Sequence, residues 1–407
     1  MRRSMIACLA LLTAQASSAR ADLYDVTNLG YLGDDYMAFL GLAINSSSQV
    51  LVETANARGR TYLTGPAGTS KLLGSPDAGV AGDAINASGQ VAGGARSADG
   101  VERAFLSGPN GGALSVVGAG ATGSYWATGV NDSGRVVGAW DRLGNGRAHA
   151  FVSAPGGGAL RDLGTLGGLG SSAHAINASG QVTGEADIPS AYGDRIHAFL
   201  SGPGGGPLRD LGTLGGTESW GWAVNASGQV AGGSYLATGG RHAFVSAPNG
   251  GALLDIGALV PHNFQTPWNQ SFGINNSGQV VGYIDGDPFS NQHAFLYTPP
   301  AVSWINANAY MGGGRLDDLN TLANAGYGTT LAYAFAINDA GDIVAVGHQY
   351  YDPVTYQAYF PYGSKSYAFL LTPRPAAVPQ PAGFVLLGTG VAGLMGWGWR
   401  RREKVAG

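Results

Sequence analysis

Histidines and aspartates recur in fixed phrases along this chain. The phrase His-Ala-Phe begins at His149, His197, His242 and His293, and an Asp-Leu-Gly or Asp-Ile-Gly phrase begins at Asp162, Asp210 and Asp255. Imidazole is a common metal ligand. However, side chains at one phrase of a repeated unit lie at corresponding places in different units, so they do not readily converge. We therefore expect structural hydrogen bonds, in turns or between units, and predict no metal site and no cofactor.

A second set of carboxylates lies in segments that differ between the repeats: Asp187, Asp194, Asp285, Asp287 and Asp352. Cleavage of a glycosidic bond needs two such groups roughly 5 to 9.5 Å apart. The chain has no HExxH and no GxSxG motif, and its single cysteine, Cys8, precedes the repeats. A carbohydrate-active enzyme, either a glycosidase or a lyase, is therefore the alternative hypothesis rather than the first one.

The elements that position these residues are repeated seven times. Variants of the phrase AINASGQV place an asparagine at Asn45, Asn86, Asn131, Asn177, Asn225, Asn275 and Asn338. Successive asparagines are 41 to 63 residues apart, which is near the period of propeller blades. Six of them also spell Asn-x-Ser, the glycosylation acceptor motif. A hairpin turn needs the same letters, so the fold alone explains the motif.

Each repeat contains four short apolar runs separated by turn residues. Ser-Gly separates the first two runs, and Gly-Pro clusters separate the last two, so each unit reads as four antiparallel strands. The sequence predicts an all-β, seven-bladed propeller over residues 22–372. The chain opens with an outer-strand phrase and its repeats end on a third strand. We therefore expect Leu23 to Leu29 to complete the last blade and close the ring.

Tryptophans lie in the variable segments that we place on the face opposite the hairpins. They are Trp126, Trp220, Trp222 and Trp268. Trp126, Trp220 and Trp268 precede a repeated asparagine by five to seven residues, so we expect them in connections that ring the channel mouth, with His174 in the fourth blade. Aromatic faces on a rigid scaffold suit recognition of sugar rings. Packing of the same rings over blade edges remains the alternative.

Both ends of the chain read as export signals. Residues 1–21 combine Arg2 and Arg3 with an apolar stretch and an Ala-Arg-Ala cleavage site. Residues 373–381 form a Pro-rich linker, and residues 382–407 contain a charge-free stretch of transmembrane length followed by a basic tail. We expect export across the inner membrane, to the cell surface or beyond it.

Two resemblances to known families support this interpretation. The tail resembles the PEP-CTERM sorting signal, which implies an exosortase-like membrane protease as a partner; the matching residues are Pro379, Gln380, Pro381, Arg400, Arg401 and Arg402. Gln380 replaces the family's glutamate, and a plain C-terminal anchor is the alternative. The repeats resemble the HAF repeat of extracellular bacterial proteins over residues 23–372, with Thr61, Arg103 and Tyr367 in place of histidine.

Charge and composition narrow the function classes. Without the two end segments, 15 basic residues remain against 25 acidic ones, so the exported part has a net charge near −10. Nucleic-acid binding is excluded because it needs a basic surface. We expect a binding or scaffold module at the cell surface or in an extracellular matrix, with exopolysaccharide as the candidate ligand. A structural protein without a ligand is a further alternative.

Overall fold

The computed structural model describes residues 23–33, 42–54, 60–65, 70–74, 79–97, 100–189, 195–260, 268–285, 292–300, 314–326, 328–349 and 365–375. The predicted signal at 1–21, the sorting residues and the tail at 382–407 lie outside these ranges, as do Asp194, Asp287 and Asp352. All strands belong to the unit Met1–Pro373, which is distinct from Arg374–Gly407. Within the described ranges, no helix has the length and apolarity needed to cross a membrane.

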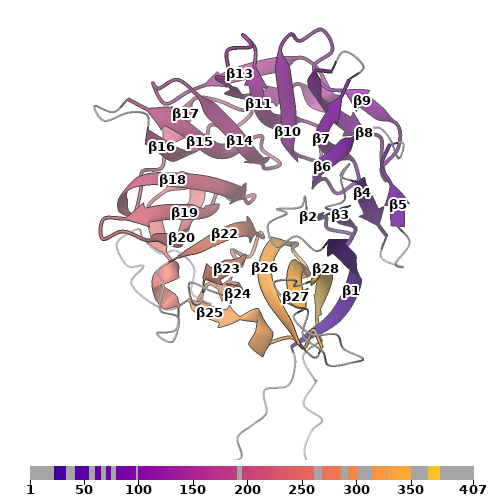
Figure 1. Cartoon of the computed structure of the whole chain (residues 1–407). Helices are drawn as coiled ribbons and strands as arrows, with labels where there is room; N and C mark the ends of the chain where they lie inside the picture. The colour runs from indigo at the N-terminus through magenta and orange to yellow at the C-terminus, as the bar shows by residue number, and fades with distance from the viewer. Residues whose placement is uncertain are drawn as a thin grey trace, which may run out of the picture. The chain divides into compact units, whose positions relative to one another are not determined.

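The unit Met1–Pro373 forms seven four-stranded antiparallel sheets placed around a central channel (Figure 1). The prediction of an all-β, seven-bladed propeller is confirmed. Blade 1 contains β2 (Leu42–Ile44), β3 (Val50–Thr54), β4 (Arg60–Thr64) and β5 (Ser70–Leu72). Blade 2 contains β6 (Val80–Ile85), β7 (Val91–Arg96), β8 (Glu102–Ser107) and β9 (Leu114–Val116). Blade 3 contains β10 (Ser124–Val130), β11 (Val136–Asp141), β12 (His149–Ser153) and β13 (Leu160–Gly164).

The remaining blades follow the same order from the channel outward. Blade 4 contains β14 (Ser171–Ile176), β15 (Val182–Ile188), β16 (Arg195–Ser201) and β17 (Leu208–Asp210). Blade 5 contains β18 (Gly215–Val224), β19 (Val230–Leu236), β20 (Arg241–Ser246) and β21 (Leu253–Asp255). Blade 6 contains β22 (Asn269–Ile274), β23 (Val280–Asp285), β24 (Gln292–Thr298) and β25 (Arg315–Asp318). Short 3-10 turns occur at Pro155–Gly157, Pro248–Gly250, Gly257–Leu259 and Leu319–Thr321.

Blade 7 takes its strands from both ends of the repeat region. It contains β26 (Thr329–Ile337), β27 (Ile343–Gln349) and β28 (Lys365–Pro373), and its outermost strand is β1 (Tyr24–Gly33). β1 runs antiparallel to β28, from the pair Tyr24 and Pro373 to the pair Gly33 and Ser366.

The turn residues make both hairpins of a blade and bring them to one face. In blade 2, the Asn86 amide donates to the oxygen of Gln90, and Gly89 closes this first turn at φ +74°. That conformation strains any residue with a Cβ. The second turn docks on the first, because Gly111 N–H donates to the oxygen of Gly89, and blades 3, 4 and 5 repeat this bond. The predicted same-face placement of the hairpins is therefore correct.

The hydrophobic core lies between the blades. Each of seven buried clusters contains side chains from two neighbouring blades. In one of them, Phe151 of blade 3 packs with Leu106 of blade 2. Full burial of such a side chain contributes about 1.5–3 kcal/mol. The phenylalanine of the His-Ala-Phe phrase is thus core.

The repeated histidines and aspartates bind one another within a blade. Histidine Nδ1 lies 2.6–2.9 Å from the carboxylate in the pairs His149–Asp162, His197–Asp210, His242–Asp255 and His293–Asp318. Each pair joins the third strand to the outer strand. The hydrogen bonding predicted for these residues is present.

Candidate functional site

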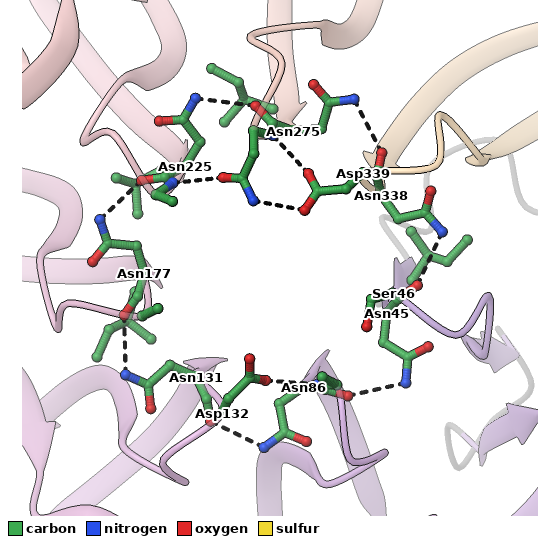
Figure 2. A pocket seen from close by; sticks show the side chains of 18 of the residues that line it. Asn45, Ser46, Asn86, Asn131, Asp132, Asn177, Asn225, Asn275, Asn338 and Asp339 are labelled. Atoms are coloured by element: carbon green, nitrogen blue, oxygen red, sulfur yellow. Dashed lines mark hydrogen bonds between the residues drawn. The ribbon is translucent and has the colours of Figure 1, made fainter.

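The seven repeated asparagines form a closed ring of hydrogen bonds around the channel, which we call the asparagine ring (Figure 2). Each side-chain Nδ2 donates to the main-chain oxygen of the asparagine in the next blade, at 2.9–3.1 Å. The donor and acceptor pairs are Asn45 to Asn86, Asn86 to Asn131, Asn131 to Asn177, Asn177 to Asn225, Asn225 to Asn275, Asn275 to Asn338 and Asn338 to Asn45.

The same amides also hold the first hairpin of each blade. Asn177 Oδ1 accepts from the amide of Gln181 at 2.9 Å and from the hydroxyl of Ser179 at 2.8 Å. Its Nδ2 also donates to Gln181 Oε1. All seven asparagines are only 2–6% exposed. Their amides are therefore committed to the fold, which accounts for the Asn-x-Ser motif.

In six of the seven blades, the inner strand contains a β-bulge three residues before the repeated asparagine. In blade 4, Ala173 pairs with Gly184 and Ala175 with Thr183, so His174 has no opposite residue. The same register shift occurs in blades 2, 3, 5, 6 and 7. A bulge turns its extra side chain away from the regular alternation and often lies next to a functional site.

A glycine on the second strand makes room for the bulge. A Cβ at Gly138 would lie 1.9 Å from the main-chain oxygen of Trp126, which no real Cβ tolerates. A Cβ would also lie 1.9–2.0 Å from a main-chain oxygen of the inner strand in the same blade at Gly93, Gly184, Gly232 and Gly282. The glycine of the repeated Gln-Val-x-Gly phrase is thus the sequence signal for the bulge, and sequence reasoning missed it.

The residues at this position form a second ring, which we call the bulge ring and which includes Leu42, its counterpart in blade 1. Its members, in blade order, are Leu42, Asp83, Thr128, His174, Trp222, Phe272 and Phe335. All seven line a cavity of about 480 Å³, together with Arg241, Gln270 and Tyr283. This volume lies in the range of small-molecule sites. A smaller cavity of about 270 Å³ lies at the asparagine ring.

Polar members of the bulge ring occupy three neighbouring blades. Thr128 donates its hydroxyl to the main-chain oxygen of Ala173 at 2.7 Å. His174 Nδ1 donates to the oxygen of Gly221 at 3.0 Å, and its Nε2 lies 3.0 Å from Glu185. Thr128 and His174 are thus tied to the blade that follows each of them.

Asp83 differs from its two polar neighbours. Its side chain is open to the channel, and no hydrogen bond or ion pair is made by it within the part of the chain that the structure describes. Although Asp83 is exposed to the channel, the surrounding blades crowd its carboxyl and remove part of its water, which raises its pKa to about 7; the negative charges of Glu53 and Glu102 add to the rise. Asp83 is therefore the polar group of the ring that is left for a ligand.

Aromatic members occupy the other side. Phe272 stacks on Phe335 with ring centroids 5.1 Å apart, and on Tyr283 at 5.7 Å. Trp222 meets Phe272 edge-on at 6.1 Å and stacks on His174 at 4.2 Å. Arg241 donates to the Tyr283 hydroxyl, and burial raises the pKa of that phenol. This wall is apolar, with one cation beside it.

Two buried donors in this wall lack an acceptor among the described residues. They are Nε1 of Trp222 and Nε of Arg241. Leaving a buried donor unsatisfied costs about 1–3 kcal/mol. The wall is therefore not optimised for stability alone, as is common at functional sites.

The predicted tryptophans divide into two groups. Trp222 lines the cavity, whereas Trp220 and Trp268 pack edge-on against Tyr235, with ring centroids 5.5 and 6.0 Å away. Trp126, Trp220 and Trp222 lie within inner strands, not in connections as we expected, because these strands extend well before the repeated phrase. Trp268 precedes β22 and is 38% exposed, with Arg241 over its ring.

The expected position of His174 was also wrong. His174 is the counterpart of Trp222, three residues before its asparagine, whereas Ser172 is the counterpart of Trp220. His174 therefore belongs to the bulge ring and not to an outer ring at the channel mouth.

The structure describes two of the five candidate carboxylates, Asp187 and Asp285. Asp187 lies on β15 of blade 4, and Asp285 ends β23 of blade 6, where it accepts from Gln292. Burial raises the pKa of Asp285, although the Gln292 hydrogen bond and Arg241 oppose the rise. Neither residue lines the 480 Å³ cavity.

Comparisons with known proteins give similarities of fold alone. No family model and no curated protein matches the sequence. TolB from Acinetobacter baumannii is 13% identical over 53% of this chain, which spans only 55% of that TolB (TM-score 0.38). YCF48 bound to a D1 peptide is 9% identical, covering 88% of this chain and 98% of its own (TM-score 0.46). A Xanthomonas campestris gluconolactonase, XC5397, is 12% identical, covering 88% and 93% (TM-score 0.41).

Proposed function

We propose that this protein is an exported binding module whose ligand enters the cavity of the bulge ring. The observation that supports this most is the bulge itself. In six blades the inner strand gives up one regular pairing, and one side chain is turned into the channel. The residue type at this position changes from blade to blade. A packing role alone would favour the same residue in every blade.

The composition of the cavity suits a saccharide. A sugar ring presents C–H faces that pack on aromatic rings such as Trp222 and Phe272, while its hydroxyls need polar partners such as Asp83. A cavity of about 480 Å³ takes a chain end or a short oligomer rather than a long polymer. We propose exopolysaccharide at the cell surface or in the extracellular matrix as the source.

A glycan array probed with the full-length protein tests this function. We expect a restricted set of glycans to bind, and Phe272→Ala to abolish the signal. Trp126→Ala is the matched control, because this ring lies on an inner strand but outside the cavity. Loss of binding with Trp126→Ala and not with Phe272→Ala would place the ligand elsewhere.

Export and sorting belong to the same proposal. We propose that residues 1–21 direct secretion, that an exosortase-like protease reads Pro379-Gln380-Pro381, and that β1 closes the exported propeller. Replacing Arg400, Arg401 and Arg402 together should block processing by removing the cytoplasmic stop. Intact Trp399 in the released protein, found by mass spectrometry, would instead indicate anchoring without processing.

An enzyme on the same ring is the second candidate. A carboxyl whose pKa is about 7, as at Asp83, can act as a general acid at neutral pH, and His174 lines the same cavity. The test is to incubate any bound oligosaccharide with the protein and count new reducing ends. Product formation that Asp83→Asn abolishes would favour the enzyme, and tight binding without product would favour the module.

A further inference from the structure

The charge distribution around the cavity indicates what kind of ligand it takes. Asp83 projects from blade 2, and the carboxylates that act on it, Glu53 and Glu102, come from β3 and β8 in blades 1 and 2. Thr128 and His174 Nδ1 donate to main-chain oxygens of neighbouring blades, and His174 Nε2 lies against Glu185. This side of the channel is therefore acidic, and ionised Asp83 offers a ligand an acceptor that no donor of the described residues occupies.

The opposite side is made of π faces. In a ring of seven blades, blade 2 lies across the channel from blades 5 and 6, which contribute Trp222 and Phe272. A carboxylate that faces aromatic rings attracts a cation with an apolar body, because the ammonium pairs with the carboxylate and the rings favour positive charge near their faces. A neutral ligand gains the stacking and hydroxyl hydrogen bonds but no charge pairing.

Arg241 sets the orientation of such a ligand. Its guanidinium lies beside Tyr283 and Trp268, on the same side as Trp222 and Phe272. The guanidinium repels an ammonium placed next to it and donates hydrogen bonds to hydroxyl or ring oxygens of a ligand. The two sides of the cavity thus differ in charge: Asp83 of blade 2 provides an acceptor on one side, and Arg241 provides a cation between blades 5 and 6 on the other.

We infer that the ligand carries a protonated amine on a sugar ring, with its ammonium against Asp83 and its ring face against Trp222 and Phe272. This inference rests on the proposed saccharide-binding function of the same site and narrows it to saccharides with a free amino group.

The test compares two oligomers that differ only at the amine. Short β-1,4-linked glucosamine oligomers and their N-acetylated counterparts are titrated into the full-length protein at pH 7, following tryptophan fluorescence and heat. The pKa of Asp83 is about 7 without ligand, and an ammonium bound beside it favours the ionised carboxylate. We expect the free amine to bind at least about tenfold more tightly, the size of one charge-assisted contact. Asp83→Asn keeps the shape of the side chain and should reduce this preference to about twofold or less. Asp187→Asn, a carboxylate outside the cavity, should leave the preference unchanged.

The possible results distinguish a failure of the amino-sugar inference from a failure of the proposed saccharide-binding function. Equal affinity for both oligomers, or a preference that survives Asp83→Asn, would overturn the amine while leaving a neutral saccharide in the cavity. If neither oligomer binds, the amine inference fails, and the saccharide function fails with it only if no glycan on the array shows Phe272-dependent binding.

Should Asp83→Asn unfold, Phe335→Leu is measured instead. It removes only aromatic character, so it should weaken the amine more than the N-acetyl oligomer, and equal weakening would contradict the inference.

Discussion

The bulge ring lies on the inner strands and the asparagine ring lies three residues later, just past the strand ends, yet the asparagine ring has seven identical residues and the bulge ring has six residue types. An asparagine of the first ring must donate to the next blade and hold its own turn, and only one side-chain shape does both. A residue of the second ring meets mainly the channel. The same residue type is therefore required where a side chain connects two blades. Different residue types are allowed where the side chain faces the channel.

The largest effect should come from removing the strand that joins the two ends. Deleting residues 22–30 takes away most of β1, so the edge of β28 and the buried side chains beside it are exposed. We expect the melting temperature to fall by about 10 °C or more, with aggregation seen by light scattering. An unchanged melting temperature would mean that the Asn338-to-Asn45 bond of the asparagine ring closes the propeller without β1.

Within one blade, Asn177→Ala and His174→Ala compare the two rings directly. Asn177→Ala removes the turn bonds and leaves the oxygen of Asn225 without its donor, so we expect a loss of about 3 kcal/mol in the free energy of unfolding. His174→Ala should cost about 1 kcal/mol. Chemical denaturation measures both, and similar losses would show that the bulge ring is also structural.

Phe272→Ala tests the bulge ring by its function. Phe272 is only partly buried, so we expect a stability loss of about 1–2 kcal/mol, less than a core phenylalanine costs, together with a fall in saccharide affinity of about tenfold or more. Calorimetric titration and thermal unfolding on the same sample separate the two. A loss above about 3 kcal/mol would assign the ring to packing.

The smallest effect is a pH dependence at Asp83. Its pKa is near 3.8 in an unfolded chain and about 7 in the fold, so between these values the folded protein holds a proton that the unfolded chain has released. Stability from this group therefore falls as the pH rises from about 4 to about 7. Because Asp83 is exposed to the channel, solvent screening makes this effect much smaller than the full pKa shift implies. Asp83→Asn should melt as the natural protein does near pH 4 and about 2 °C higher at pH 8.

A second group titrates in the same window with the opposite sign. Burial lowers the pKa of His348 to about 4, so its contribution to stability rises between pH 4 and 6.5. Both proteins contain His348, so its contribution cancels in the difference between their melting curves. A constant difference across the pH range would contradict the assignment to Asp83.

The sequence predicts the blades well because turn chemistry is local. The glycine that follows Ser88 permits the positive φ that closes the first hairpin, and Gly134, Gly180, Gly228 and Gly278 do the same in later blades, so hairpins and blade count follow from counting phrases. Ser48 takes the same conformation in blade 1, where the glycine is missing.

The site is harder to predict because a bulge is a relation between two strands. The residues around Asp83 and Trp222 carry no local sequence signal for a bulge. The bulge also interrupts the alternation of inward and outward side chains by which a longer strand would be recognised. Trp126 and Trp220 were therefore placed in connections. The signal lies on the next strand, where Gly138 and Gly232 replace a strand-forming residue opposite the bulge.

The asparagine ring has a consequence for how such a protein can change. Every junction uses the same amide and the same main-chain oxygen, so any blade presents a joint that fits any other. Duplicating, deleting or exchanging blades by recombination keeps this hydrogen bond between blades and places a different bulge-ring residue in the channel wall. Shuffling whole blades between propellers of this kind would change the ligand specificity one position at a time and keep these hydrogen bonds, while the buried clusters between the blades would still have to fit.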